Sequence, residues 1–217
     1  MGYDRVKQLG DPLEEIDRLV DWEAFRKYLH QNSSVGRHGY DPIVLLKTLV
    51  LQGLYGISDE QIEYQIADRS SFQKFLGFPN SIPDYSTVWR FREELGKKQY
   101  TDEIWNELKK QLLEKGITFS KGVIQDARII HADPGKKNSG KDERGRAANT
   151  SRSADGTWTK KGKKSMFGFK MHNKVDTKTK MIMEFAVTTA KVPDGNIDLT
   201  NEDEFVYRDK GYFGFNA

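Results

Sequence analysis

Two aspartates in the second half of the chain have the residue type and setting that phosphodiester chemistry needs. Asp126 interrupts the apolar, β-branched residues 123–130, and Asp209 follows a second short apolar run. An acid within an apolar strand is costly to bury unless it is paired or holds a cation. Carboxylate oxygens suit Mg²⁺ and Mn²⁺, and a pair of such ions can stabilise both the attacking and the leaving oxygen of a phosphodiester. If the two strands are neighbours, the sequence predicts a divalent metal site. The alternative is a structural Asp126, bonded to Arg128 or to a backbone amide.

Basic residues later in the chain are candidates for contact with DNA. Lys170 and His172 alternate along an expected strand and so share one of its faces, although a hydrogen-bonded structural histidine explains His172 equally well. Four lysines flank Trp158, and lysines beside an aromatic ring suit a phosphate backbone and an unstacked base. They are Lys160, Lys161, Lys163 and Lys164. A loop that is disordered without DNA is the competing interpretation.

Two arginines in the first half are further candidates. Arg90 and Arg92 lie on an expected helix, where they could meet DNA while Trp89 and Phe91 face the core. Helix, tight turn and helix is a geometry that places a helix in the major groove, but it is also how small helical domains are built. Two glutamates follow Arg92 directly and disfavour deep insertion into the groove.

The composition is that of a water-soluble protein. Of the 217 residues, 36% are hydrophobic and 31% are charged, and no apolar run approaches the roughly 20 residues of a membrane-spanning helix. The first residues lack the basic and then apolar pattern of a secretion signal. Cysteine is absent, which excludes disulfides, thiolate metal sites and a cysteine nucleophile. These features fit a protein of the reducing cytoplasm.

The net charge of +3 conceals an uneven distribution. Residues 1–120 hold 16 basic and 19 acidic residues, whereas residues 121–217 hold 19 basic and 13 acidic residues. Most of the positive excess lies within residues 134–180. Such a concentration is typical of proteins that bind polyanions such as DNA, and a solvated basic loop is the alternative.

The first half of the chain shows helical periodicity and helix start and stop signals. Asp-Pro pairs at residues 11–12 and 41–42 can cap and begin helices, Ser58 can cap another, and Gly56 and Gly116 can end them. The pattern predicts helices over residues 12–30, 43–54, 59–66, 70–76, 87–95 and 101–115.

The pattern changes to that of strands near residue 122. Strands are expected over residues 123–130, 167–175, 181–188 and 204–208, with a long exposed loop over residues 134–164. Asp176 and Thr177 supply a turn, so the second and third strands are expected to form an antiparallel hairpin. The elements predict an α+β chain of two domains, with a helical domain over residues 1–120 and an α/β domain over residues 121–217.

An ordered series of motifs resembles the DDE transposases of bacterial and archaeal insertion sequences, specifically the insertion sequence five family. The resemblance covers nearly the whole chain, and the full series is far more specific than any one motif. The motifs are GYDP (39–42), LQGLYGISDEQIEYQ (51–65), DRSSF (68–72), FLG (75–77), IPDYSTVWRFR (82–92), DGTWTKKG (155–162), FGFKMH (167–172) and VPDG (192–195).

The resemblance implies a helical N-terminal domain for DNA binding or dimerisation, followed by an RNase H-like catalytic domain that uses Mg²⁺ or Mn²⁺. Asp126 matches the family's first catalytic acid, and Asp209, before a Lys-Gly-Tyr segment, matches the second. The implied activity is metal-dependent cleavage and strand transfer of DNA. The implied partners are terminal inverted repeats and target DNA.

The sequence departs from the family at the third catalytic acid, a Glu on a later helix. No acid follows Asp209 within these residues, and the acids at 202–204 precede the last expected strand, toward its opposite end. We therefore expect an incomplete catalytic domain and an isolated chain that neither cleaves nor joins DNA. A DNA-binding regulator of a full-length transposase and a non-functional remnant are alternatives, and a homodimer or a separate C-terminal fragment is an expected partner.

Overall fold

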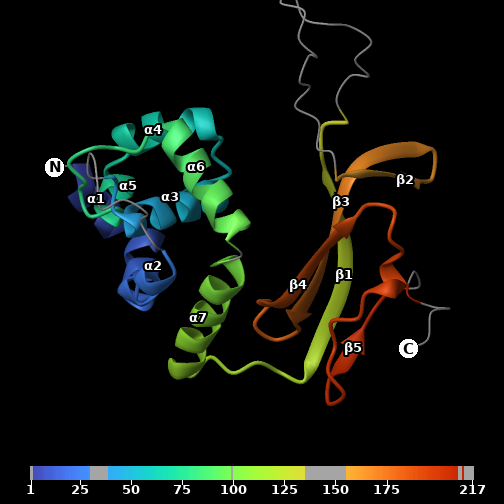
Figure 1. Cartoon of the computed structure of the whole chain (residues 1–217). Helices are drawn as coiled ribbons and strands as arrows, with labels where there is room; N and C mark the ends of the chain where they lie inside the picture. The colour runs from blue at the N-terminus through green and yellow to red at the C-terminus, as the bar shows by residue number, and fades with distance from the viewer. Residues whose placement is uncertain (1, 30–38, 99, 135–154, 210–211, 213–217) are drawn as a thin grey trace, which may run out of the picture. The chain divides into compact units, whose positions relative to one another are not determined.

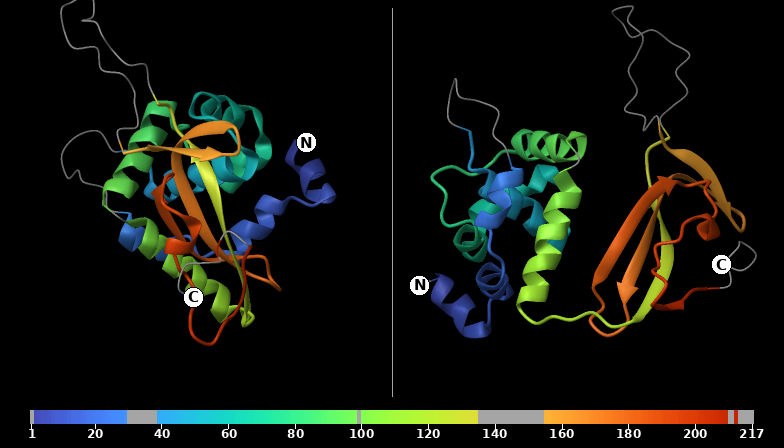
Figure 2. Two further views of the ribbon diagram at one scale, coloured as in Figure 1. Left: turned by 90° about the vertical axis from the view of Figure 1, so that its right-hand side faces the viewer. Right: turned by 60° about the horizontal axis from the view of Figure 1, so that its bottom comes forward.

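The computed structural model describes the chain apart from residues 1, 30–38, 99, 135–154, 210–211 and 213–217. The chain is of the α+β class and divides into two compact units, Met1–Ile117 and Thr118–Ala217. The first is helical and the second is built on a β-sheet, as Figures 1 and 2 show. No helix in the described ranges is long and apolar enough to cross a membrane.

The helical unit contains short helices, of which the first, α1, was not predicted and the later ones follow the predicted order. Asp11 and Asp41 cap α2 and α3, each accepting a bond from a backbone N–H two residues on. Gly56 ends α3 in the left-handed conformation, with φ of 63°. The elements are α1 (Gly2–Leu9), α2 (Pro12–Leu19), the 3₁₀ helix η1 (Glu23–Tyr28), α3 (Pro42–Tyr55), α4 (Asp59–Asp68), α5 (Ser70–Phe75), α6 (Tyr85–Lys97) and α7 (Tyr100–Glu114).

The single helix expected over residues 12–30 is wrong, because the chain breaks between α2 and η1. The side chain of Gln111, on α7, accepts a hydrogen bond from the Asp21 N–H at 2.9 Å and donates one to the Asp21 carbonyl at 3.0 Å. A distant glutamine therefore satisfies backbone groups that a continuous helix would have paired internally.

One other helix start and one capping bond differ from the sequence prediction. The helix α6 begins at Tyr85 rather than Thr87, because Asp84 is its cap and accepts a bond from the Thr87 N–H at 2.9 Å. Ser58 occupies the capping position of α4, but its side chain makes no capping bond.

Two hydrophobic clusters form the core of the helical unit. The first joins α2, α3, α4, α5 and α6, and the second joins η1, α3 and α6. Their sequence periodicity is helical, so each helix contributes one buried face. The first cluster consists of Leu13, Leu51, Ile62, Ile66, Phe72, Phe75, Leu76 and Val88, and the second consists of Phe25, Leu29, Ile43, Leu46 and Leu95.

The second unit is a sheet whose strands follow the order β2-β3-β1-β5, with β4 also paired to β3. The strands are β1 (Gly122–His131), β2 (Thr157–Lys161), β3 (Lys164–Asp176), β4 (Ile182–Thr189) and β5 (Phe205–Tyr207). The expected hairpin is confirmed, because β3 and β4 pair in antiparallel fashion across the turn that follows Asp176. The last strand, β5, returns parallel to β1.

The long exposed loop expected over residues 134–164 is only partly correct. Residues 157–161 form β2, which pairs with the start of β3 through a tight turn at Gly162 and Lys163. Gly162 has φ of 61°, a conformation that glycine adopts without strain. Residues 135–154 of the expected loop lie outside the described residues.

The segment between β4 and β5 covers one face of the sheet and leaves the other open. On the covered face, Gln125, His172, Lys174 and Asp176 are almost completely buried. On the open face, apolar side chains remain exposed on β1, β4 and β5. They are Ile124, Ile130, Phe185, Val187, Phe205 and Tyr207.

Candidate active site

Asp126 and Asp209 lie at the same level of neighbouring parallel strands. The β1–β5 ladder pairs Gly122 with Phe205 and ends where Ile124 pairs with Tyr207. Each aspartate follows its strand's last paired residue by two positions, so each projects from the same face as Ile124 and Tyr207. Both aspartates are exposed. The condition on which the predicted metal site depended, that the two strands are neighbours, is met.

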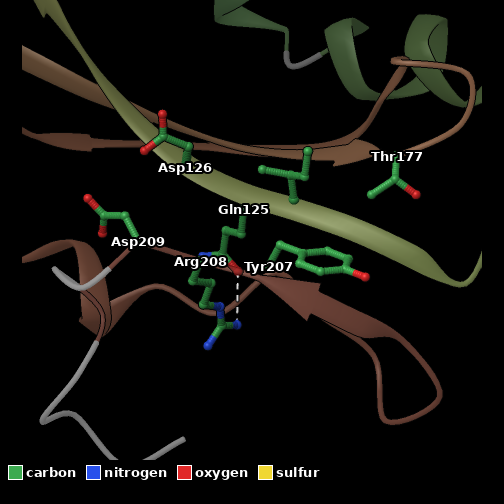
Figure 3. A pocket seen from close by; sticks show the side chains of 7 residues that line it. Gln125, Asp126, Thr177, Tyr207, Arg208 and Asp209 are labelled. Carbon is green, nitrogen blue, oxygen red and sulfur yellow. Dashed lines mark hydrogen bonds between the residues drawn. The ribbon is translucent and has the colours of Figure 1, made fainter.

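The two aspartates line one pocket of about 760 Å³. Figure 3 shows their carboxylates at the same end of this pocket. Asp126 is not buried within its apolar strand, because alternation along β1 turns this residue to the open face while its neighbours at 125 and 127 turn to the covered face. The pocket is lined by Ile124, Gln125, Asp126, Thr177, Tyr207, Arg208 and Asp209.

The phenol of Tyr212 is buried near several carboxylates, and its pKa is raised. Burial raises its pKa, and the nearby carboxylates of Asp194, Asp126 and Asp209 raise it further, to about 12. Tyr212 is 6% exposed. Asp126 and Asp209 therefore both place negative charge near this buried phenol.

The donor set fits a hard divalent cation. Both side chains offer carboxylate oxygens, both face an open pocket, and no hydrogen bond or ion pair joins Asp126 to Arg128 or to any other described residue. Two neighbouring carboxylates repel each other, and a cation between them removes that repulsion. Within the described ranges, no three His, Asp or Glu side chains are grouped so as to hold a metal ion.

Family comparison accounts for both units of the chain. Residues 2–94 match the family model described as Transposase domain (DUF772). Residues 117–216 match the family model of the Transposase DDE domain. Together these matches support a DDE-type transposase. The search of solved structures found no match.

Lys170 and His172 share one face of β3, as the sequence predicts. This is the face of the sheet that the segment between β4 and β5 covers. The Lys170 ammonium donates to the Val192 carbonyl and to the Asp194 carboxylate, both at 2.7 Å. His172 is completely buried, and its Nε2 lies 2.9 Å from the Thr188 hydroxyl. Burial lowers the pKa of His172, and the charge of Lys170 lowers it further against the opposing effect of Asp194.

These positions favour one of the two interpretations of His172. A DNA contact needs an exposed side chain, which His172 does not present, whereas the hydrogen-bonded structural histidine fits its burial. Lys170 is likewise engaged by the segment that covers the sheet. The two residues pack behind the sheet and are separate from the pocket that Asp126 and Asp209 line.

The four lysines expected to contact DNA lie at one end of a hairpin. Lys160 and Lys161 end β2, Lys163 is in the turn, and Lys164 begins β3. All four are exposed, and no ion pair with a described acid engages them. Lys161 pairs directly with Lys164, an arrangement that is destabilising without an anion. Trp158, on the same hairpin, is 55% exposed and contacts the Phe167 ring.

The two arginines of α6 have different surroundings. Arg90 is exposed, and among the described residues it bonds within its own helix, to the Ser86 carbonyl and hydroxyl. Arg92 reaches α4, where its guanidinium donates to the Asp59 carboxylate at 2.6 and 2.9 Å, and it also donates to Gln52. These bonds to Asp59 raise the pKa of Arg92. Arg92 therefore joins α6 to α3 and α4 within the helical unit.

The expectation that Trp89 faces the core is wrong, whereas that for Phe91 is confirmed. Trp89 is 50% exposed, and Phe91 packs against the second hydrophobic cluster. The face of α6 centred on Val88 and Leu95 is buried, which turns Trp89 outward beside Arg90.

The sequence pattern did not identify Gln125, Arg208 or Tyr212 as part of the site. Gln125 and Arg208 directly precede the two aspartates and form a hydrogen bond of 3.0 Å on the covered face. Alternation in the strand could have indicated that both point inward, but their pairing depends on β5 lying beside β1.

Proposed function

We propose that the chain is a transposase of the insertion sequence five type, whose RNase H-like sheet unit holds Mg²⁺ or Mn²⁺ between Asp126 and Asp209. The observation that carries the proposal is the level placement of these carboxylates on adjacent parallel strands, facing one pocket. Three antiparallel strands followed by a strand that returns parallel to the first support the RNase H-like assignment. The match of residues 117–216 to the DDE domain supports the chemistry.

The substrate of this site is the phosphodiester backbone of DNA. Bound divalent ions would activate the attacking oxygen and stabilise the leaving oxygen. Asp126 and Asp209 would hold the ions, and the open pocket leaves room for a DNA strand beside them. The hairpin lysines and Arg90 are the exposed basic residues that we propose to contact DNA, because Lys170, His172 and Arg92 are engaged inside the protein.

The metal site is tested by adding Mn²⁺ to the isotopically labelled protein and recording the paramagnetic broadening of its amide signals. We expect broadening of the amides around residues 126 and 209 at the same Mn²⁺ concentrations. Asp126→Asn and Asp209→Asn should each weaken it by about tenfold or more, because each removes one anionic ligand. Asp203→Asn removes an equal charge at the other end of β5 and should leave the affinity unchanged. Broadening that is unaffected by either ligand substitution would refute the site.

We further propose that the described residues alone do not complete the catalytic centre. Among the described residues, no third acidic side chain is grouped with Asp126 and Asp209 so as to bind a metal ion. The isolated chain should therefore show no cleavage of transposon-end DNA with Mn²⁺. Supplying a C-terminal fragment that carries the missing acid, or a partner copy, should restore cleavage. Strand transfer by the purified 217-residue chain, abolished by Asp126→Asn, would contradict this proposal.

The second candidate function is a DNA-binding regulator without catalysis. The exposed lysine hairpin favours it, because this hairpin does not depend on a complete metal site. Gel-shift assays would compare terminal inverted-repeat DNA with random DNA at matched salt. Selective binding without cleavage, even when the C-terminal fragment is present, supports the regulator. Restored cleavage supports the transposase.

A further inference from the structure

The backbone ladder between β1 and β5 ends before it reaches the two aspartates. Only three residue pairs join these strands, and the last is Ile124 with Tyr207. The strand β5 is three residues long and lies at the edge of the sheet. Backbone pairing therefore does not fix the distance between Asp126 and Asp209, which lie two residues beyond it.

The residues directly before the aspartates are joined on the covered face of the sheet. Arg208 donates from its guanidinium to the Gln125 side-chain oxygen at 3.0 Å, the bond drawn in Figure 3. Gln125 is 1% exposed. This bond connects β1 to the chain after β5 at the level where the backbone ladder has already ended.

The segment between β4 and β5 holds both partners of this bond. Gln125 donates to the Ile197 carbonyl at 2.6 Å and accepts from the Leu199 N–H at 3.3 Å. These two bonds fix the orientation of the Gln125 amide, so its oxygen faces Arg208 in one orientation. Amide and guanidinium together form a rigid connection rather than a single flexible contact.

Arg208 is fixed by the same segment. Its guanidinium bonds to the Asp198 carboxylate and to the Thr200 hydroxyl, and it lies 5.5 Å from the centre of the Tyr212 ring. Burial raises the pKa of Asp198, but hydrogen bonds from Thr200 and the charge of Arg208 outweigh this effect and lower it. Asp198 is therefore anionic near neutral pH and keeps Arg208 in place.

We propose that Gln125 and Arg208 are positioning residues that set the separation of the Asp126 and Asp209 carboxylates for metal binding. Adjacent residues of a strand project to opposite faces, so a bond behind the sheet fixes the side chains in front of it. This inference rests on the proposed function, because it assigns the two carboxylates to one metal site. The bond between Gln125 and Arg208 lies on the covered face, so we assign both residues a role that acts through the two carboxylates.

Two substitutions distinguish an effect of carboxylate position on metal affinity from an effect of charge. Gln125→Met keeps the side-chain length and the charge but removes the amide. Arg208→Met removes a positive charge near the pocket, which by electrostatics alone would strengthen cation binding. A loss of Mn²⁺ affinity in Arg208→Met therefore reports geometry. Lys178→Met, at the exposed turn after β3, is the control for the removal of a positive charge.

The experiment measures Mn²⁺ affinity by paramagnetic broadening and, without metal, the hydrogen exchange of the β5 amides. We expect affinity to fall about tenfold in Gln125→Met and in Arg208→Met, the scale for residues that orient metal ligands. Exchange of the β5 amides should quicken in both variants, while the helical unit exchanges as before. Lys178→Met should match the wild type in both measurements.

The outcomes distinguish this inference from the metal site itself. If the wild type shows no Mn²⁺ broadening near residues 126 and 209, the proposed function fails. If the wild type binds but both methionine variants bind equally well, only the positioning role fails. If a methionine variant does not fold, Arg208→Lys, which keeps the charge but not the planar fork, provides the comparison; unchanged affinity in that folded variant would overturn the positioning role.

Discussion

The carboxylate of Asp176 holds the turn between β3 and β4 to the start of the sheet unit. It accepts bonds from the N–H and hydroxyl of Ser120, at 2.6 and 2.5 Å. It also accepts bonds from the N–H groups of Lys178 and Thr179 and from the Thr179 hydroxyl. Burial raises the pKa of Asp176, but the bonds from Ser120 and Thr179 outweigh this effect and lower it well below its usual range.

The stability of the sheet unit should therefore depend on pH below about 4, the ordinary aspartate range. Because the pKa of Asp176 is lowered by folding, its stabilisation is complete above that range and is lost as the pH falls toward the folded-state pKa. Asp176→Asn should lower the free energy of unfolding by about 2 to 4 kcal/mol at pH 7 and by less at pH 2. Urea unfolding followed by amide signals of residues 118–209 measures both.

The control for this prediction is Asp203→Asn, an exposed acid of the same unit. It should change the unfolding free energy by less than about 0.5 kcal/mol at either pH. Equal effects of the two substitutions at pH 7 would show that the Asp176 bonds do not hold the turn.

At the scale of a single helix, two adjacent residues of α6 lie in different environments, one in the core and one at the surface. Val88 is completely buried in the first hydrophobic cluster, whereas Trp89 is 50% exposed. Val88→Ala should lower the free energy of unfolding by about 2 kcal/mol, because it removes buried apolar surface and leaves a cavity. Trp89→Ala should change it by less than about 0.5 kcal/mol. Thermal unfolding monitored by far-ultraviolet circular dichroism checks both values.

The Trp89→Ala variant also tests whether the outward face of α6 contacts DNA. If Trp89→Ala leaves stability unchanged but weakens binding to inverted-repeat DNA, the outward face of α6 contacts DNA together with Arg90. If stability falls as much as in Val88→Ala, the orientation of α6 described above is wrong.

The lysine hairpin supplies an element-scale prediction about DNA. Lysines that neutralise phosphates release counterions, so the logarithm of the binding constant falls with the logarithm of salt concentration by about 0.9 per phosphate contact. The double substitution Lys161→Gln and Lys163→Gln should reduce this slope by about 1 to 2. Fluorescence anisotropy with duplex DNA over a range of salt concentrations measures the slope. Lys121→Gln with Lys178→Gln, outside the hairpin, should leave it unchanged.

At the scale of the whole molecule, the two units differ in how much apolar surface they bury. The helical unit has two hydrophobic clusters, whereas the covered face of the sheet is rich in polar side chains such as Gln125 and Lys174. The open face leaves Phe205 71% exposed and Val187 55% exposed. An exposed apolar face contributes little stability and invites association with other chains.

We therefore expect the sheet unit to open at a lower free energy than the helical unit. Amides of β3 should exchange with solvent at least about tenfold faster than those of α4, where Ile62 and Ile66 are completely buried. Hydrogen exchange measured by mass spectrometry on the intact chain resolves the two units. Equal protection of both would contradict the expectation, as would proteolysis that spares residues 118–217 as readily as residues 1–117.

The sequence by itself determined the features that depend on near neighbours in the chain. Asp-Pro pairs and Gly56 fixed where helices begin and end, and the change to β-branched residues marked β1. The ordered motifs identified Asp126 and Asp209 as a pair before their strands were known to be adjacent. These signals are local because capping, turn formation and periodicity act over a few residues.

Only the tertiary structure decided the features that depend on distant residues. The break after α2 required Gln111, ninety residues away, and the outward orientation of Trp89 depended on which helices pack against α6. The burial of His172 required the segment that crosses the sheet. The bond between Gln125 and Arg208 required β5 to lie beside β1. Local periodicity predicts which face of a helix or strand is buried. It does not predict which distant residues pack against that face, because these are brought together only when the strands and helices pack.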